Sequence, residues 1–270
     1  MALGPLTFAI AHHARDATKD WPASATIPDV ELLLRTLAKW RAQIIAKTYL
    51  THHGPIIRDG LFAGMTYLEH AEEGSLIARL LGVYEAELHP HLQRFVEDGV
   101  DCVIDVGCAE GYYAVGLARR YPHLEVRAHD ISEAARTACH QLAERNGVAD
   151  RVRIGALFAP EDFEAFADRK PLVLVDAEGA EVDILDPDRS PTLARMRIVV
   201  ETHDVWRKGA LKTLRDRFEA SHDIVEVHAQ AKAFTPPEWL AQLSELDLLL
   251  ATWEWRYRAT PWLVMAPRAE

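Results

Sequence analysis

The run from Asp105 to Gly111 carries the residues of this 270-residue chain best suited to holding a ligand. An apolar, β-branched stretch leads into Asp105, and small residues then follow at every second position as Gly107, Ala109 and Gly111. Small residues let the backbone approach a ligand closely, and a carboxylate at a strand end accepts hydrogen bonds from a hydroxyl or a cation. The spacing D-x-G-x-A-x-G is not the G-x-G-x-x-G of dinucleotide-binding turns. It predicts a strand, a tight ligand-binding turn and the start of a helix.

A second acid strengthens this prediction. Residues 124–130 alternate apolar and polar side chains and end at Asp130, which lies 25 residues beyond Asp105. A carboxylate at the end of the next strand is the expected acceptor for two ribose hydroxyls. Ser132 then offers an N-cap for the following helix. The alternative is an α/β domain that uses the same turn only for packing.

Two further predicted strands end in groups that can move a proton. Asp176 and Glu178 follow residues 171–175, and Glu201 and His203 close the next strand. His203 is the candidate general base because the ordinary pKa of histidine lies near neutral pH. Glu201 is the candidate for orienting its ring and stabilising the imidazolium. The alternative is a surface histidine that begins a loop.

The same groups offer a second chemistry. Asp176, Glu201 and His203 supply oxygen and nitrogen ligands, and a bound Mg²⁺ or Mn²⁺ would lower the pKa of a substrate hydroxyl. Hard-ion sites usually show more carboxylates than can be assigned here, so a metal is not favoured.

The elements that position these residues alternate between strand and helix from residue 102 onward, which predicts a doubly wound, Rossmann-like α/β sheet. The candidate parallel strands are 102–106, 124–130, 151–155, 171–176 and 196–202. Residues 223–228 and 261–267 alternate like strands without a full crossover helix between them, which favours an antiparallel C-terminal strand.

The first 100 residues differ from the rest in pattern. Residues 29–49 and 75–96 have helical spacing, with Pro90 expected to kink or divide the second helix. Residues 1–28 contain three prolines and are expected to form an arm or loop. We therefore predict an N-terminal helical extension or substrate lid over residues 1–100 and a cofactor-binding domain over residues 101–270.

The first motif resembles that of class I S-adenosylmethionine (SAM) dependent methyltransferases. The element D-A-E-G-A-E at residues 176–181, followed about 20 residues later by V-V-E, is similar to the FkbM-type methyltransferases among them. The resemblance covers residues 100–205 and implies SAM as cofactor. The cofactor-binding residues it implies are Asp105, Gly107, Ala109, Glu110, Gly111, Asp130, Ile131, Ala156 and Asp176. The turn at residues 155–158 departs from the pattern, since it lacks the acid that many SAM enzymes place against adenine.

The resemblance implies O-methylation of a small-molecule hydroxyl, as in a secondary metabolite or sugar, or of a peptide or small-molecule carboxylate. A protein or RNA methyltransferase is one alternative, and a non-catalytic SAM-binding module is another. A net charge of −11 disfavours a nucleic-acid partner.

The remaining composition bears on location. Three cysteines without metal-type spacing fit reduced thiols in a cytoplasmic protein. Residues 2–11 lack the basic start of a signal peptide, and no window is long and apolar enough to span a membrane. We expect a cytoplasmic protein with no membrane partner, and nothing in the sequence specifies an oligomeric state.

Overall fold

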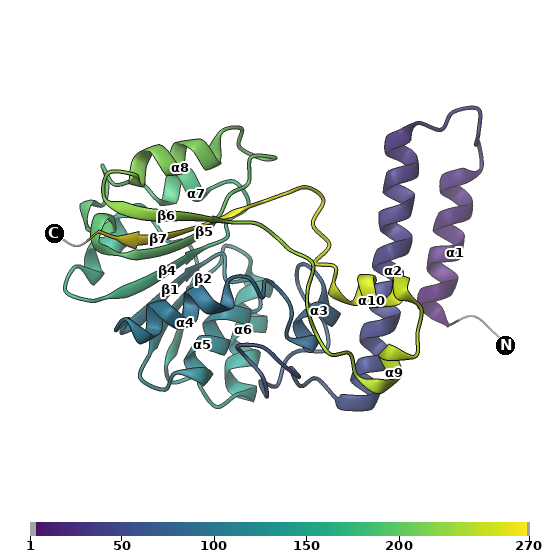
Figure 1. Ribbon diagram of the computed structural model, residues 1–270, viewed down its shortest axis with the longest axis horizontal. Coiled ribbons are helices and arrows are strands. Elements are labelled where there is room, and N and C mark those ends of the chain that lie inside the picture. Colours follow the sequence, from purple (N-terminus) through teal and green to yellow (C-terminus); the bar gives the residue numbers. More distant parts are fainter. Residues whose placement is uncertain (1–3, 269–270) are drawn as a thin grey trace.

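A computed structural model describes residues 4–268, and these contain one seven-stranded sheet covered by helices on both faces (Figure 1). Its strands are β1 (Cys102–Val106), β2 (Glu125–His129), β3 (Val152–Gly155), β4 (Pro171–Val175), β5 (Arg197–Glu201), β6 (His222–Val227) and β7 (Trp262–Pro267). Their order across the sheet is β3-β2-β1-β4-β5-β7-β6. β7 runs in the direction opposite to the other six strands. The predicted Rossmann-like fold with an antiparallel C-terminal strand is confirmed.

The central strands are apolar on both faces because helices cover both. In β1, Val103 packs with the cluster under α4 (His89–Glu97), α5 (Tyr112–Arg120) and α6 (Glu133–Arg145), whereas Ile104 belongs to the opposite cluster. The second cluster is covered by α7 (Glu181–Ile184) and α8 (Ala210–Phe218), with 3₁₀ turns at η1 (Pro160–Phe166) and η2 (Pro191–Arg195). Burial on both faces explains the continuous apolar runs of the parallel strands.

The N-terminal region begins with two helices, α1 (Pro5–Thr18) and α2 (Ile27–His53), which form a hairpin that stands away from the sheet (Figure 1). The expectation of an arm or loop over residues 1–28 was therefore wrong for most of its length, and residues 1–3 lie outside the described range. Pro5 occupies the first turn of α1, where a missing N–H costs nothing. Thr26 and Asp29 form a capping box that starts α2.

The predicted helical segment over residues 75–96 is divided into α3 (Leu76–Leu81) and α4, but Gly82 makes the break. Gly82 ends α3 at φ +79°, and a Cβ there would lie 1.9 Å from the carbonyl oxygen of Asp59. Pro90 instead lies in the first turn of α4.

The segment between β6 and β7 crosses back to the N-terminal helices (Figure 1). It contains two short helices, α9 (Glu238–Ala241) and α10 (Glu245–Thr252), and the Ser244 side chain caps the start of α10 at the backbone N–H of Asp247. Arg41 of α2 binds the Asp247 carboxylate with N–O distances of 2.6 and 2.9 Å. The helical part thus combines the N-terminal helices with the segment between β6 and β7, while α4 lies on the sheet. The domain boundary at residue 100 stays a prediction.

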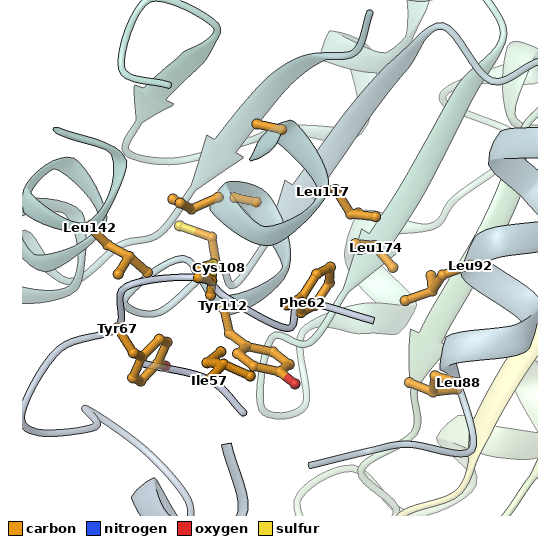
Figure 2. Packing of buried hydrophobic residues seen from close by; sticks show 14 of the residues in the cluster. Ile57, Phe62, Tyr67, Leu88, Leu92, Cys108, Tyr112, Leu117, Leu142 and Leu174 are labelled. Atoms are coloured by element: carbon orange, nitrogen blue, oxygen red, sulfur yellow. The ribbon is translucent and has the colours of Figure 1, made fainter. Parts of the chain in front are cut away.

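Residues 54–68 attach this helical part to the sheet domain (Figure 2). Phe62 is fully buried and its ring meets Tyr112 edge-on, with 5.0 Å between centroids. Gly116 of α5 faces that ring, and a Cβ at this position would lie 2.6 Å from it. Separately, no helix within residues 4–268 has both the length and the apolar character needed to cross a bilayer.

We predict that Gly116→Ala destabilises the protein by about 1–2 kcal/mol, measured by urea unfolding. Alanine favours a helix by up to about 1 kcal/mol, but overpacking against an enclosed ring costs about 1–3 kcal/mol. The double variant Gly116→Ala/Phe62→Leu serves as the control, because a smaller side chain relieves the clash and the two effects should not add. A stabilised Gly116→Ala protein would mean that Phe62 does not pack on α5 as described.

Candidate functional site

The turn between β1 and α5 presses against the end of β4. Gly107 adopts φ +85°, and a Cβ there would lie 1.7 Å from the carbonyl oxygen of Asp176. Gly111 adopts φ +91°, and its Cβ would lie 2.7 Å from the sulfur of Cys139 on α6. Ala109 between them also has a positive φ, of 45°. The backbone conformation and the close packing of this turn therefore also require the small residues that were predicted from ligand binding.

Asp105 is a buried carboxylate at the inner end of this turn. One of its oxygens accepts a hydrogen bond from the backbone of Ala114, and Oδ2 has no partner among residues 4–268. Burial raises its pKa to about 7, and the charge of Asp130 adds to the rise. The side chain lines a cavity shared with Gly107 and Asp176, where a cationic ligand would stabilise its ionised form.

Asp130 lies at the end of β2, as predicted, and holds the turn in place. Its Oδ2 accepts the backbone N–H of Ala109 at 3.0 Å, and its Oδ1 accepts that of Ser132 at 2.8 Å. A carboxylate offers about four acceptor positions, so about two remain for hydroxyl groups.

Two apolar side chains stand exposed beside Asp130. Ile131 is 82% exposed, and Leu157, which follows β3, is 74% exposed. The N–H of Asp130 donates to the carbonyl of Gly155 at 3.2 Å, so the ends of β2 and β3 lie together. Ala156, another expected cofactor contact, lies between Gly155 and Leu157 in the chain. The sequence signal for Leu157, its place directly after a strand, was too weak to single it out. Ile131 and Leu157 are suited to pack against an aromatic base, because the turn at residues 155–158 has no acid to bind one.

Glu110, an expected cofactor contact, lines the turn cavity and also belongs to a buried hydrogen-bond network. Its fully buried carboxylate accepts hydrogen bonds from the hydroxyl of Tyr67 and the backbone of Glu72, and it lies 3.7 Å from Nε of Arg79. This network ties the N-terminal region to the turn. Phe62, Met65 and Tyr67 are core residues, whereas Tyr84 lines the cavities.

A second group of side chains lies beyond the ends of β4 and β5. His203 is only 5% exposed, and its Nε2 lies 3.7 Å from Oδ1 of Asp176 and 3.5 Å from Oε2 of Glu178. Its Nδ1 donates a 2.7 Å hydrogen bond to Oε1 of Glu181. The same oxygen accepts the backbone N–H of Gly179 at 2.9 Å. Glu181 thus holds both the loop after β4 and the ring of His203.

Glu201 does not orient His203, which corrects the sequence-based expectation. Its Oε1 is 3.9 Å from Nε2 and instead binds Arg256 and the hydroxyl of Thr260. The metal-ligand set expected from sequence changes in the same way. The potential ligand atoms that lie within 4.8 Å of one another belong to Asp176, Glu178 and His203, without Glu201.

The charges around this group raise two pKa values. Burial raises the pKa of Asp176 well above its ordinary value, and the neighbouring carboxylates, Glu201 first, raise it further. Burial alone would lower the pKa of His203, but the hydrogen bond to Glu181 and the charge of Glu201 outweigh it and the pKa rises. The site therefore favours an added positive charge.

Arg256 belongs to a buried ion-pair network rather than to a free binding surface. Its guanidinium contacts the carboxylates of Glu85, Glu201 and Glu254, the last at 3.0 Å. Burial raises the pKa of Glu85 to about 8, although Arg256 opposes the rise. With three carboxylates around it, Arg256 closes the space between β5 and the N-terminal region.

The cavity over the Asp176 and His203 side chains measures about 240 Å³ and opens between the sheet and α2. Its rim combines aromatic and cationic side chains, namely Lys39, Trp206, Trp255, Tyr257 and Arg258. The cofactor-turn cavity adjoins it, since Tyr84 and Asp176 line both. Two ligands bound side by side would meet at Asp176.

Comparison with models of protein families and with curated proteins found no match. Solved structures with a similar arrangement include the human methyltransferase 10 domain containing protein, at 10% identity over 84% of this chain and 97% of that one, with a TM-score of 0.49. An O-methyltransferase from Bacillus cereus in complex with SAH matches at 10% identity over 99% and 93% of the two chains, with a TM-score of 0.42.

The C-terminal domain of precorrin-6Y C5,15-methyltransferase from Rhodobacter capsulatus matches at 16% identity over 63% of this chain and 81% of that one, with a TM-score of 0.41. Likenesses this distant do not assign an activity. The function proposed below therefore depends on the residues of this chain's own site.

Asp105→Asn should remove a pH dependence of stability. The folded-state pKa of about 7 lies above the ordinary 3.8, so the folded protein retains a proton that the unfolded chain has lost between these values. Stability contributed by this group is thus full below about pH 4 and is lost as the pH rises towards 7. At pH 8 the variant should be about 1–3 kcal/mol more stable than the wild type, because a buried charge has been removed.

Urea unfolding at pH 5 and pH 8 measures this difference. An unchanged pH slope in Asp105→Asn would show that another group carries it. Asp150→Asn, a change at an exposed carboxylate after α6, is the control and should leave the slope as it is.

Proposed function

We propose that this protein is a SAM-dependent methyltransferase that methylates an oxygen atom of a small molecule. The observation that carries the proposal is the adjacency of two different sites at the carboxyl edge of one sheet. A turn flanked by Asp105 and Asp130 lies beside a proton-accepting group built on Asp176 and His203. Ligands of open α/β sheets bind at this edge.

The charge of the turn favours SAM over a nucleotide phosphate. A pyrophosphate needs free N–H groups at a helix start and no opposing anion. Here the turn presents the buried carboxylate of Asp105, whose Oδ2 has no partner within residues 4–268, and has Asp130 on its outer side. SAM carries a sulfonium and an ammonium group, so its charge complements Asp105 while its ribose hydroxyls suit Asp130. We assign the exposed side chains of Ile131 and Leu157 to the adenine ring.

Transfer to a hydroxyl follows from this placement. An oxygen lone pair of the acceptor forms the new C–O bond as the C–S bond breaks, and the electron pair of that bond stays on sulfur as a neutral thioether. The hydroxyl loses its proton, and Nε2 of His203 is the basic atom facing the adjoining cavity. It can act as a free base, or it can hold a cation that acidifies the hydroxyl. Alignment of the two ligands supplies most of the remaining rate acceleration.

The FkbM-type resemblance supports a small acceptor such as a secondary metabolite or sugar. Its D-x-E-G-x-E element supplies Asp176, Glu178 and Glu181, all of which contribute to the His203 site. A cavity of about 240 Å³ suits a small acceptor. The charge of −11 argues against RNA, and the proton-accepting group beside the turn argues against a module that only binds SAM. A cytoplasmic location stays a prediction.

SAM and its demethylated product should bind with dissociation constants in the micromolar range, measured by calorimetry. Asp130→Ala should weaken both by at least about tenfold, because ribose hydroxyls lose their acceptor. Asp150→Ala is the matched control and should bind like the wild type. Equal affinity in wild type and Asp130→Ala would remove the ribose assignment, and no binding by the wild type would remove the proposal itself.

His203→Ala should lower methyl transfer by about 10²–10⁴-fold at neutral pH while SAM affinity stays near that of the wild type. The assay follows the labelled methyl group from SAM to acceptors found in a panel of hydroxylated small molecules. Asp204→Asn is not a suitable control because Asp204 accepts the backbone N–H groups of Gly209 and Leu211 at the start of α8. Glu219→Gln, at the exposed C-cap of α8, is used instead. Full activity of His203→Ala would point to a carboxylate acceptor, which is already ionised at neutral pH.

A further inference from the structure

We propose that Asp176, Glu178 and His203 form a binding site for a divalent cation, with Glu181 as the residue that positions the imidazole. The sequence did not favour a metal because too few carboxylates could be assigned to one. Its candidate set contained Glu201, which the structure pairs with Arg256, and lacked Glu178. The cation site stands on geometry alone. Its role in acidifying an acceptor hydroxyl rests on the function proposed above.

The spacing of the donor atoms fits a shared ion better than it fits direct bonds. Nε2 of His203 is 3.7 Å from Oδ1 of Asp176 and 3.5 Å from Oε2 of Glu178, too far for strong hydrogen bonds. Ligands at about 2.1–2.2 Å from one ion lie about 3.0–3.6 Å apart when the angle between them is octahedral or tetrahedral. The two distances from Nε2 lie at or just beyond the upper end of this range, and all three donor atoms lie within 4.8 Å of one another, so small shifts would bring them around one cation.

The hydrogen bond to Glu181 prepares His203 for metal binding. Its Nδ1 donates to Glu181, and this leaves the lone pair of Nε2 directed at the two other carboxylates. A carboxylate that holds the far nitrogen is the usual support of a metal-binding histidine, where it fixes the ring and raises its basicity. Glu181 is itself fully buried and held by the backbone of Gly179, so the ring has little freedom to turn.

Neither carboxylate ligand has a cationic partner of its own. Within residues 4–268, no lysine or arginine forms an ion pair with Asp176 or Glu178. The Oδ1 atom of Asp176 is buried without a hydrogen-bond partner there. Glu178 accepts a 2.8 Å hydrogen bond from the indole of Trp206, which orients its carboxylate without neutralising it. Arg256, which lines the same cavity, is already surrounded by three other carboxylates.

The donor set selects the kind of ion. Two carboxylate oxygens and one imidazole nitrogen suit Mn²⁺ or Mg²⁺, with the remaining positions left to water and an acceptor oxygen. A hydroxyl bound there loses its proton to water more readily, because the cation stabilises the alkoxide. This would leave the acceptor oxygen beside Asp176, the residue at which the two cavities meet.

The test measures the binding of Mn²⁺ alone to the full chain, without SAM or acceptor. Calorimetry gives the affinity, and electron paramagnetic resonance identifies the ligands. We expect about one ion per chain and a ¹⁴N coupling from an imidazole in the pulsed spectrum. His203→Ala should abolish the nitrogen coupling, and Glu178→Gln, a change at a half-exposed side chain that leaves the fold intact, should weaken binding at least about tenfold. Glu181→Gln should weaken it about 10–100-fold, the usual effect of losing the group that holds a metal-binding histidine.

Glu73→Gln is the control, because Glu73 lines the same cavity on its exposed side but lies outside the ligand set. Its effect should stay within about threefold, as expected for one screened charge. No Mn²⁺ binding, binding without a nitrogen signal, or a nitrogen signal that survives in His203→Ala would each overturn the site. Mn²⁺ binding without SAM binding would keep the site and remove the proposed function. SAM binding and methyl transfer without Mn²⁺ binding would remove the site and leave His203 as the free base.

Discussion

The close approach of Gly107 to the end of β4 is the constraint on which the rest of the site depends. The carbonyl oxygen of Asp176 occupies the position that a Cβ of residue 107 would need, and the N–H of Asp176 donates to Val106 at 2.9 Å. The turn after β1 and the loop after β4 are therefore fixed against each other by the backbone. This places the buried carboxylate of Asp105 and the His203 group at adjoining cavities, whatever their side chains later bind.

Buried polar contacts extend that constraint to the N-terminal region. Glu110 in the turn bonds to Tyr67 and lies beside Arg79, and Arg256 joins Glu85 to Glu201 at the end of β5. Buried ion pairs add little net stability, but removing one partner leaves a costly unpaired charge. Their contribution is to fix position. The N-terminal region thus forms one wall of the site through specific contacts and not through apolar packing alone.

The sequence predicted the sheet well, because burial on both faces and short connections leave a clear pattern. β1 was predicted at its observed bounds and the other four parallel strands to within one residue of theirs. Asp130 was found from its place at a strand end, because the geometry of a parallel sheet determines where strand ends meet. Helix α1 was missed because none of its residues is buried, so its apolar pattern is weak, and three prolines obscured it further. The partner of His203 was missed because a loop that folds back, and not the strand register, brings Glu181 to it.

The most direct test of the central claim is a crystal structure of the protein with the demethylated product of SAM bound. Our account predicts ribose hydroxyls about 3 Å from the Asp130 carboxylate and the amino acid end beside Asp105. It also predicts that the sulfur faces the cavity lined by Asp176 and His203. A product bound elsewhere on the chain, or bound with its sulfur directed away from Asp176, would contradict the account.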